Sequence, residues 1–167
     1  MKNEKGITLV ILTITIIVMM ILAGIVAHYS RDLIRNAKLQ DLKTNMLLIQ
    51  AKAKECVEEV SFQIANINDG STIEQIKSTN YKGTPLVGSG IEEEARATGK
   101  IEDAKINEYY YFTLEDLKNI GITELLPEDY GYFIVRYNLE KISVDVINTK
   151  GYKGAYDIQE IISISEE

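Results

Sequence analysis

The sequence predicts an α+β protein in which one long N-terminal helix packs on a small antiparallel β-sheet head. Three observations carry this prediction. An uncharged apolar run covers residues 7–27, and an apolar stripe at helical spacing follows over residues 39–60, in a helix expected to end near residue 67. Near the C-terminal end, two β-rich segments over residues 131–138 and 142–148 have the partial alternation of a strand–turn–strand unit.

The apolar run predicts that the first half of the helix is transmembrane. From Ile7 to Ala27 there is no charged residue, and the polar side chains are Thr8, Thr13 and Thr15. A helical threonine hydroxyl bonds back to its own backbone, which makes it tolerable in lipid. A helix of about twenty apolar residues spans a hydrocarbon core of about 30 Å. We expect the short N-terminal tail to be cytoplasmic and the remainder of the chain to be exported.

A cleaved signal peptide is a second interpretation of the same run. Its apolar core should be shorter, and it should end in a small-x-small site. A cut after Ala27 would need a small side chain at position 25, where the sequence has Ile25. The anchor helix is therefore the better prediction.

The residues before the run suggest why it begins so abruptly. The stretch KGITLVIL, residues 5–12, resembles the cleavage and methylation motif of type IV prepilins and type II secretion pseudopilins. In that family a membrane-embedded aspartyl peptidase cuts after a leader ending in glycine, and the new N-terminal residue is N-methylated. The resemblance implies that Gly6 precedes the cut and that Ile7 becomes the first residue. Thr8, Leu9 and Val10 then match the Thr-Leu-Ile/Val of the motif, and Ile11 and Leu12 continue the assembly helix.

Position 11 departs from the family pattern, which usually has glutamate there. That carboxylate is thought to pair with the amine of a neighbouring subunit in lipid, where an unpaired charge is costly. Some tip-type pseudopilins lack it, as do many Firmicutes pilin-like proteins with an ITLVALV-type start. This sequence, with Ile11, resembles the Firmicutes group more closely.

The stripe after the apolar run predicts a helix that continues into the head. Its apolar members step by three and four: Leu39, Leu42, Met46, Ile49, Ala53, Cys56 and Val60. A helix from Ile7 to about Ile67 would be about 90 Å long at about 1.5 Å per residue. A coiled coil is the alternative, but the stripe lasts only about three heptads without ordered flanking charge pairs. We expect packing on the head, Cys56 as a small core residue, and a helix stop at Asn68-Asp69-Gly70.

The remaining segments predict short helices around the sheet. A capping box at Ser71–Glu74 starts a helix through Ile76, residues 78–90 form a loop, and Glu92, Glu93 and Glu94 open a helix that ends before Gly99. Thr113 and Asp116 cap a helix whose apolar face is Leu114, Leu117 and Ile120. Alternation places Tyr109 and Tyr111 on one face and Tyr110 on the other. The last segment adds an edge strand or a short terminal helix. Residues 109–150 also resemble the head of Firmicutes pseudopilin-like proteins.

The composition gives no support for enzymatic chemistry or for a cofactor. The chain has one histidine, His28, and one cysteine, and it carries a formal net charge of −7 without a lysine or arginine block. Metal sites need converging ligands, and a Ser-His-Asp set needs more histidines. Counting back from Asp69 for a calcium loop gives Ile67 and Ala65, which are not oxygen ligands. We expect no catalytic, cofactor-binding or metal-binding residues, and there is no strong signal for nucleic acid.

These expectations divide the chain into a leader (1–6), a transmembrane or filament-core helix (7–27), an amphipathic continuation (28–68) and an α+β head (69–167). The resemblance implies a structural subunit, of the minor kind, in a type IV pilus-like or pseudopilus filament. Its partners would be a prepilin peptidase, the membrane, and other pilin or pseudopilin subunits in a homo- or hetero-oligomer. It would start as a single-pass protein of the cell membrane and end in an extracellular filament. The alternatives are a permanently anchored surface protein with a ligand- or partner-binding head, and a competence pseudopilin for DNA uptake.

Overall fold

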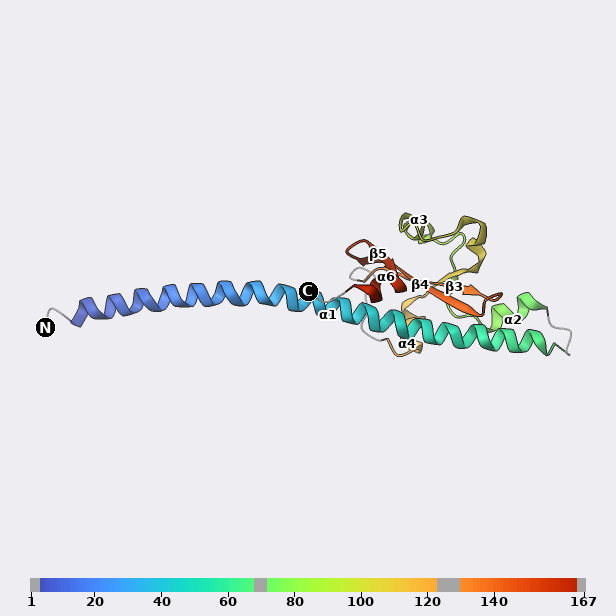
Figure 1. The fold of residues 1–167 in the computed structure, drawn as a ribbon, viewed down its shortest axis with the longest axis horizontal. Coiled ribbons are helices and arrows are strands. Elements are labelled where there is room, and N and C mark those ends of the chain that lie inside the picture. The colour runs from blue at the N-terminus through green and yellow to red at the C-terminus, as the bar shows by residue number, and fades with distance from the viewer. Residues whose placement is uncertain (1–3, 68–71, 123–129, 165–167) are drawn as a thin grey trace. The chain divides into compact units, whose positions relative to one another are not determined.

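The computed structural model describes residues 4–67, 72–122 and 130–164, without the side chains of residues 4–9, 27, 28, 31 and 32. The chain divides into two units: an N-terminal unit up to Lys38 and a compact unit that begins at Leu39. Each is described by itself. The predicted α+β class is confirmed, with a long N-terminal helix and an antiparallel sheet (Figure 1).

Helix α1 extends from Glu4 to Ala65 and contains 62 residues. It therefore begins before residue 7, where the apolar run starts, and ends two residues before the expected Ile67. The predicted stop at Asn68-Asp69-Gly70 lies outside the described residues. Among the residues described, no helix offers a stretch both long enough and apolar enough to cross a membrane.

The sheet is a five-stranded antiparallel meander in the order β1-β2-β3-β4-β5. Its strands are β1 (Thr84–Pro85), β2 (Tyr109–Tyr111), β3 (Phe133–Asn138), β4 (Ser143–Tyr152) and β5 (Ala155–Asp157). The predicted hairpin is β3 and β4, paired from Phe133 opposite Asn148 to Asn138 opposite Ser143. Strands β4 and β5 meet in a two-residue turn, Lys153-Gly154, in which both residues have positive φ, as this kind of hairpin requires.

Short helices connect and flank the strands: α2 (Ile73–Asn80), α3 (Glu92–Ala97), the 3₁₀ segment η1 (Asp103–Glu108), α4 (Leu114–Asn119) and α6 (Ile158–Ser163). The predictions for α3 and for the cap of α4 are confirmed. Thr113 accepts from the backbone N–H of Asp116, whose carboxylate accepts from the N–H of Thr113. The C-terminal segment holds both of the elements that the sequence left open, strand β5 and helix α6.

Two local predictions are wrong in part. The capping box of α2 is formed by Thr72 and Gln75, one residue later than predicted, and the helix continues past Ile76 to Asn80. The first residues of the predicted loop 78–90 belong to this helix. The same segment also contains the edge strand β1. Pro85 fits there because proline, which lacks an N–H, is tolerated in edge strands.

The sheet is covered on both faces, so all six residues of β3 are buried. On one face the stripe of α1 packs against Phe133, Val135 and Tyr137, and α4 and α6 complete this core. The buried stripe residues of α1 are Leu39, Leu42, Met46, Ile49, Ala53, Val57 and Val60. On the other face a smaller cluster contains Leu86, Ala95, Tyr109, Ile134 and Ile147.

Packing of the stripe on the head is thereby confirmed, with one correction. Val57, which is fully buried, completes the stripe, whereas Cys56 is half-buried at its edge. The helical period explains the shift, because Ala53, Val57 and Val60 follow steps of four and three that keep one face toward the sheet. Burial raises the pKa of the Cys56 thiol, which disfavours its thiolate form.

Candidate functional site

The predicted processing residues lie in the first turns of α1. Gly6, Ile7, Thr8 and Leu9 have helical backbone, and their side chains lie outside the described part of the chain. His28, at the expected membrane exit, is also helical without a described side chain. The structure therefore places these residues on one helix but does not test their roles.

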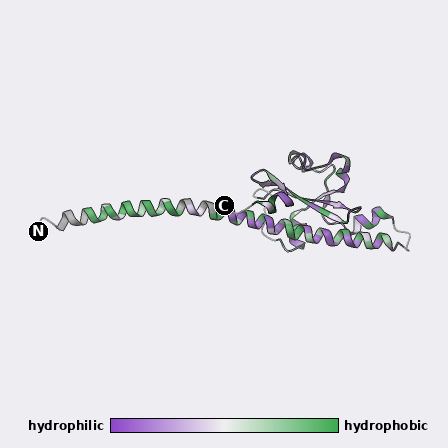
Figure 2. Cartoon of the chain, in the orientation of Figure 1, coloured by the Kyte–Doolittle hydropathy of each residue, from purple (hydrophilic) through white to green (hydrophobic). Residues whose placement is uncertain are grey.

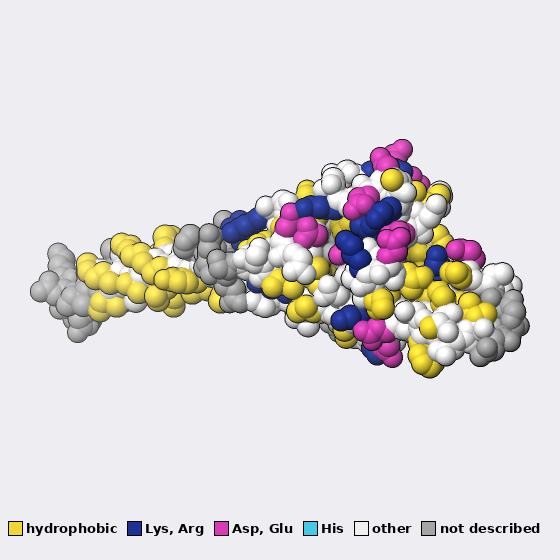
Figure 3. Space-filling model, turned by 45° about the vertical axis from the view of Figure 1, so that its right-hand side comes forward, with side chains coloured by type: hydrophobic (Ala, Val, Ile, Leu, Met, Phe, Trp, Pro, Cys, Tyr) yellow, Lys and Arg dark blue, Asp and Glu magenta, His cyan; other side chains and the backbone are white. Residues whose placement is uncertain are grey.

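The described part of the assembly segment is exposed throughout. Val10, Ile11 and Leu12 have exposed fractions of 55, 56 and 58%, and every residue from 10 to 26 is exposed. Figure 2 shows this stretch as almost continuously hydrophobic, and Figure 3 shows apolar side chains covering it. So large an apolar surface on a single helix has no packing partner among the described residues. An exposed apolar surface of this extent is typical of a segment that contacts another apolar surface.

Thr15 makes the hydrogen bond within its own helix that is expected of a threonine in an apolar run. The Thr15 hydroxyl donates to the backbone carbonyl of Leu12 at 2.8 Å, so this hydroxyl has a partner within its own helix. Ser30 makes the equivalent bond to Val26 at 2.7 Å. Such bonds let a hydroxyl sit on an apolar helix without needing water.

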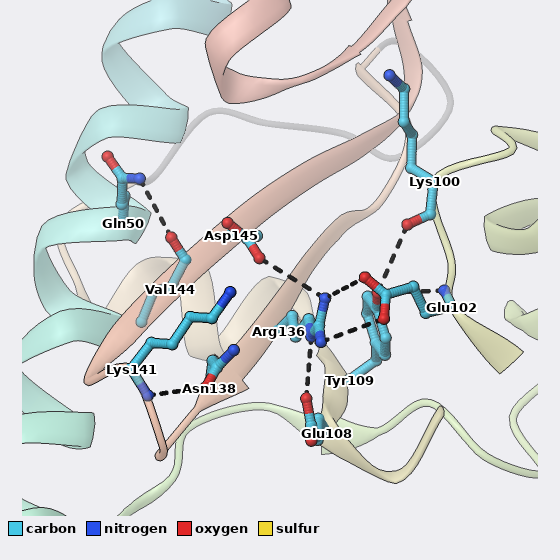
Figure 4. A network of polar contacts seen from close by, with 10 residues as sticks. All are labelled: Gln50, Lys100, Glu102, Glu108, Tyr109, Arg136, Asn138, Lys141, Val144 and Asp145. Carbon is cyan, nitrogen blue, oxygen red and sulfur yellow. Dashed lines mark hydrogen bonds and ion pairs between the residues drawn. The ribbon is translucent and has the colours of Figure 1, made fainter. Parts of the chain in front are cut away.

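The compact unit holds a polar network that sequence reasoning missed (Figure 4). Arg136, in the middle of β3, is almost completely buried, and its guanidinium donates to Glu102 at 2.7 Å and to Glu108 at 2.9 Å. Asp145, its cross-strand partner on β4, lies 3.9 Å away, and the guanidinium lies 5.6 Å from the ring centre of Tyr109. The only signal in the sequence is an arginine within the apolar run FIVRYN.

The contacts of this network favour the charged forms of Arg136 and Glu102. Burial on its own lowers the pKa of Arg136, but the hydrogen bonds to Glu108 and Glu102 outweigh it, and the net result is a pKa above the ordinary value. The same hydrogen bond from Arg136 lowers the pKa of Glu102. One guanidinium thus ties η1 to strands β3 and β4, and it faces three carboxylates.

A second ion cluster joins the segment after α3 to the C-terminal helix. Lys100 contacts Asp157 at 2.8 Å and also forms an ion pair with Glu160. Asp157 is in addition the N-cap of α6, where its carboxylate accepts from the backbone N–H of Glu160 at 2.9 Å. Both clusters tie together segments that are far apart in the chain.

The tyrosines of β2 alternate as predicted. Tyr109 and Tyr111 pack in the smaller cluster, and Tyr110 packs on the α1 side of the sheet. On that side Tyr110 makes edge-to-face contacts with two further rings, Tyr81 and Tyr137, at centroid distances of 5.7 and 5.3 Å. No local pattern in the sequence indicates these two partners.

Within the described residues, no group of three or more histidine, cysteine, aspartate or glutamate side chains is arranged to hold a metal ion. No family model, no curated protein and no solved structure matches the chain. The function must therefore be argued from the chain's own residues.

Proposed function

We propose that this protein is a structural subunit, of the minor kind, in a type IV pilus-like or pseudopilus filament. The observation that carries the proposal is the change in character along α1. Residues 10–26 expose apolar side chains all round the helix, whereas from Leu39 a single stripe is buried against a sheet. A helix with one half committed to its own head and one half without an intramolecular partner suits assembly with neighbouring subunits.

In this proposal a prepilin peptidase cuts after Gly6 and the new N-terminal residue, Ile7, is N-methylated. Residues 7–27 wait in the cell membrane and then move into a bundle of like helices. The proposal includes residues 7–9 and 27, whose side chains are not described. Because the transfer exchanges one apolar environment for another, specificity must come from side-chain packing along Leu9–Ile25 and from the processed N-terminus.

Ile11 fits this proposal as an apolar contact. It is exposed, it follows Val10 and Leu12 in an unbroken apolar series, and it would bring no buried charge into the bundle. A carboxylate at this position would need a cation nearby in lipid. A subunit that lacks this carboxylate would rely on side-chain packing alone to hold its register in the helical bundle.

The test is the intact mass and N-terminal sequence of the protein recovered from its own cells. The expected chain begins at Ile7, with one methyl group on its amine. A Gly6→Val variant should keep residues 1–6 because a bulky side chain replaces the glycine at the cut, while a Gly24→Ala variant should be processed normally. Wild-type protein that retains residues 1–6 would favour the permanently anchored surface protein instead.

A further inference from the structure

The compact unit contains a pocket whose chemistry the filament proposal does not use. It has a volume of about 590 Å³ and lies where α2, the end of η1, strand β2 and the β3–β4 turn meet. This volume is within the range of about 300–1,000 Å³ that small-molecule sites occupy. Three tyrosines line it: Tyr81, Tyr110 and Tyr137.

One of these tyrosines has an unsatisfied polar group. Tyr81 is 9% exposed, and its buried hydroxyl has no hydrogen-bond partner. The hydroxyl of its stacking partner Tyr137 is fully used, because it accepts from the backbone N–H of Lys82 at 3.1 Å and donates to the Lys82 carbonyl at 2.9 Å. A buried hydroxyl without a partner costs free energy and is rare in native proteins. Tyr81 lines the pocket, so a ligand there would give this hydroxyl a partner once the side chains that cover it have moved.

The charges around the pocket are unbalanced. Three carboxylates line it, Glu74, Glu108 and Glu140, against a single ammonium, Lys77. Lys77 is already engaged by Glu74 at 3.2 Å, and Glu108 shares the guanidinium of Arg136 with Glu102. Glu140 makes no hydrogen bond or ion pair with any described residue. The pocket thus has negative charge that the described residues do not neutralise.

Burial, the largest cause, and the nearby Tyr110, Glu108 and Glu74, all of which line the pocket, together raise the pKa of Tyr81 to about 12. The hydroxyl therefore stays neutral at physiological pH and can accept a hydrogen bond from a donor that enters. Tyrosine rings also attract cations, and Tyr110 is the least buried of the three rings.

We propose that this pocket, which we call the tyrosine pocket, binds an alkylammonium or guanidinium group. An anion is repelled by the three carboxylates, and a neutral ligand would leave Glu140 uncompensated. In this proposal a cationic donor pairs with the exposed Glu140 and lies against the ring of Tyr110, and it donates to the Tyr81 hydroxyl once the side chains that cover that hydroxyl have moved. The source of the cation is either a basic side chain of another protein or a free amine. This inference does not depend on processing at Gly6.

The experiment is calorimetric titration of the full chain, held in nonionic detergent at low ionic strength, with butylammonium chloride. We expect saturable binding of butylammonium and of butylguanidinium, and none of the uncharged analogue butanol. A blocked peptide, acetyl-Gly-Lys-Gly amide, separates the two sources. Binding of the peptide about tenfold tighter than that of butylammonium assigns the pocket to a protein partner, and weaker binding assigns it to a free amine.

Two variants, Glu140→Gln and Tyr81→Phe, test where the cation binds, and a third variant, Glu93→Gln, is the control. Glu140→Gln should weaken the binding of butylammonium about fivefold, as expected for the loss of one partly exposed ion pair. Glu93→Gln makes the same charge change on α3, away from the pocket, and should leave affinity unchanged. Tyr81→Phe keeps all the carboxylates and should also weaken binding several-fold. Absence of saturable binding, equal effects of the two glutamate variants, or undiminished affinity in Tyr81→Phe would each overturn the proposal.

Discussion

The rings of Tyr81 and Tyr137 stack face to face, with centroids 4.1 Å apart and planes inclined by only 6°. The two residues come from different elements, since Tyr81 ends α2 and Tyr137 lies near the end of β3. Their hydroxyls differ in a way that stability measurements can detect, because one is fully hydrogen-bonded and the other has no partner.

We expect Tyr137→Phe to lower the free energy of unfolding by about 1–3 kcal/mol, because it leaves the backbone N–H and carbonyl of Lys82 without their partner. Tyr81→Phe is the matched control, since it also removes one hydroxyl and keeps the ring. In the absence of an added amine it should leave the stability unchanged or raise it by up to about 1 kcal/mol. Urea unfolding of both variants makes the comparison, and equal losses would contradict it.

Arg136 should contribute more to stability than any exposed arginine of the compact unit. We expect Arg136→Met to lower the free energy of unfolding by about 2 kcal/mol, because the variant loses charge-assisted hydrogen bonds to Glu102 and Glu108. Arg136→Lys should recover only part of the loss, since an ammonium cannot reproduce the guanidinium fork.

Arg96 supplies the control for this measurement. It pairs with Glu92 at 2.8 Å on the surface of α3, where solvent weakens the interaction. Arg96→Met should therefore change the urea midpoint much less than Arg136→Met does. Similar effects of the two substitutions on the urea midpoint would show that the burial of Arg136 adds nothing to its contribution to stability.

The Lys100 cluster predicts a stability difference that depends on pH. The hydrogen bond from Lys100 lowers the pKa of Glu160 from its ordinary 4.5. For Asp157 burial acts in the opposite direction, but the bonds from Lys100 and from the backbone of Glu160 prevail and lower its pKa from 3.8. The bonds to Asp157 and Glu160 raise the pKa of Lys100 from 10.5.

A carboxylate whose pKa is lowered by folding stabilises the fold above its unfolded pKa and loses that effect as the pH falls through the folded value. A lysine whose pKa is raised stabilises the fold below its unfolded pKa and loses the effect as the pH rises through the folded value. The urea midpoints of wild type and Lys100→Met should therefore differ by a constant amount from about pH 5 to pH 10. The difference should shrink at both extremes, and a difference that is independent of pH would refute the assignment.

Gly131 should tolerate no side chain. Its φ is +70°, and a Cβ there would lie 2.7 Å from the hydroxyl oxygen of Thr149 and 2.8 Å from the backbone nitrogen of Lys150. We expect Gly131→Ala to cost at least about 2 kcal/mol in the free energy of unfolding, the sum of backbone strain and the clash. Gly154→Ala has the same kind of strain, with φ +84° and nothing within 4 Å, and should cost about 1 kcal/mol. Thermal or urea unfolding distinguishes the two.

The elements of this fold that could be predicted from the sequence are those whose signal is local. The stripe from Leu39 to Val60 and the alternation of Tyr109–Tyr111 are periodic patterns, and the Thr113 cap needs only residues three apart. The capping box of α2 was misplaced by one residue because Ser71 and Thr72 are both good caps and Glu74 and Gln75 are both good partners.

The polar clusters could not be predicted, because their members are far apart in the chain. Glu102 precedes Arg136 by 34 residues, and Lys82 precedes Tyr137 by 55. Nothing in a sequence marks which of many carboxylates will meet a given arginine. The tyrosine pocket likewise exists only after α2, β2 and β3 have come together. The motif at Gly6 and Ile7 is the opposite case: it can be recognised from a few adjacent residues, and its role stays a prediction.

The bond from the ammonium of Lys43 to the backbone carbonyl of Ile164, 2.7 Å long, joins residues that are 121 positions apart. On the same side of the sheet, Ile158 and Ile161 of α6 belong to the core that the α1 stripe forms. The first helix and the last one of the compact unit must therefore both be present before that core is complete. During synthesis, the stripe of α1 therefore stays without the α6 part of its core until residues near 164 have been made. In that interval the nascent chain carries two exposed apolar surfaces on a single helix, which makes it prone to aggregation.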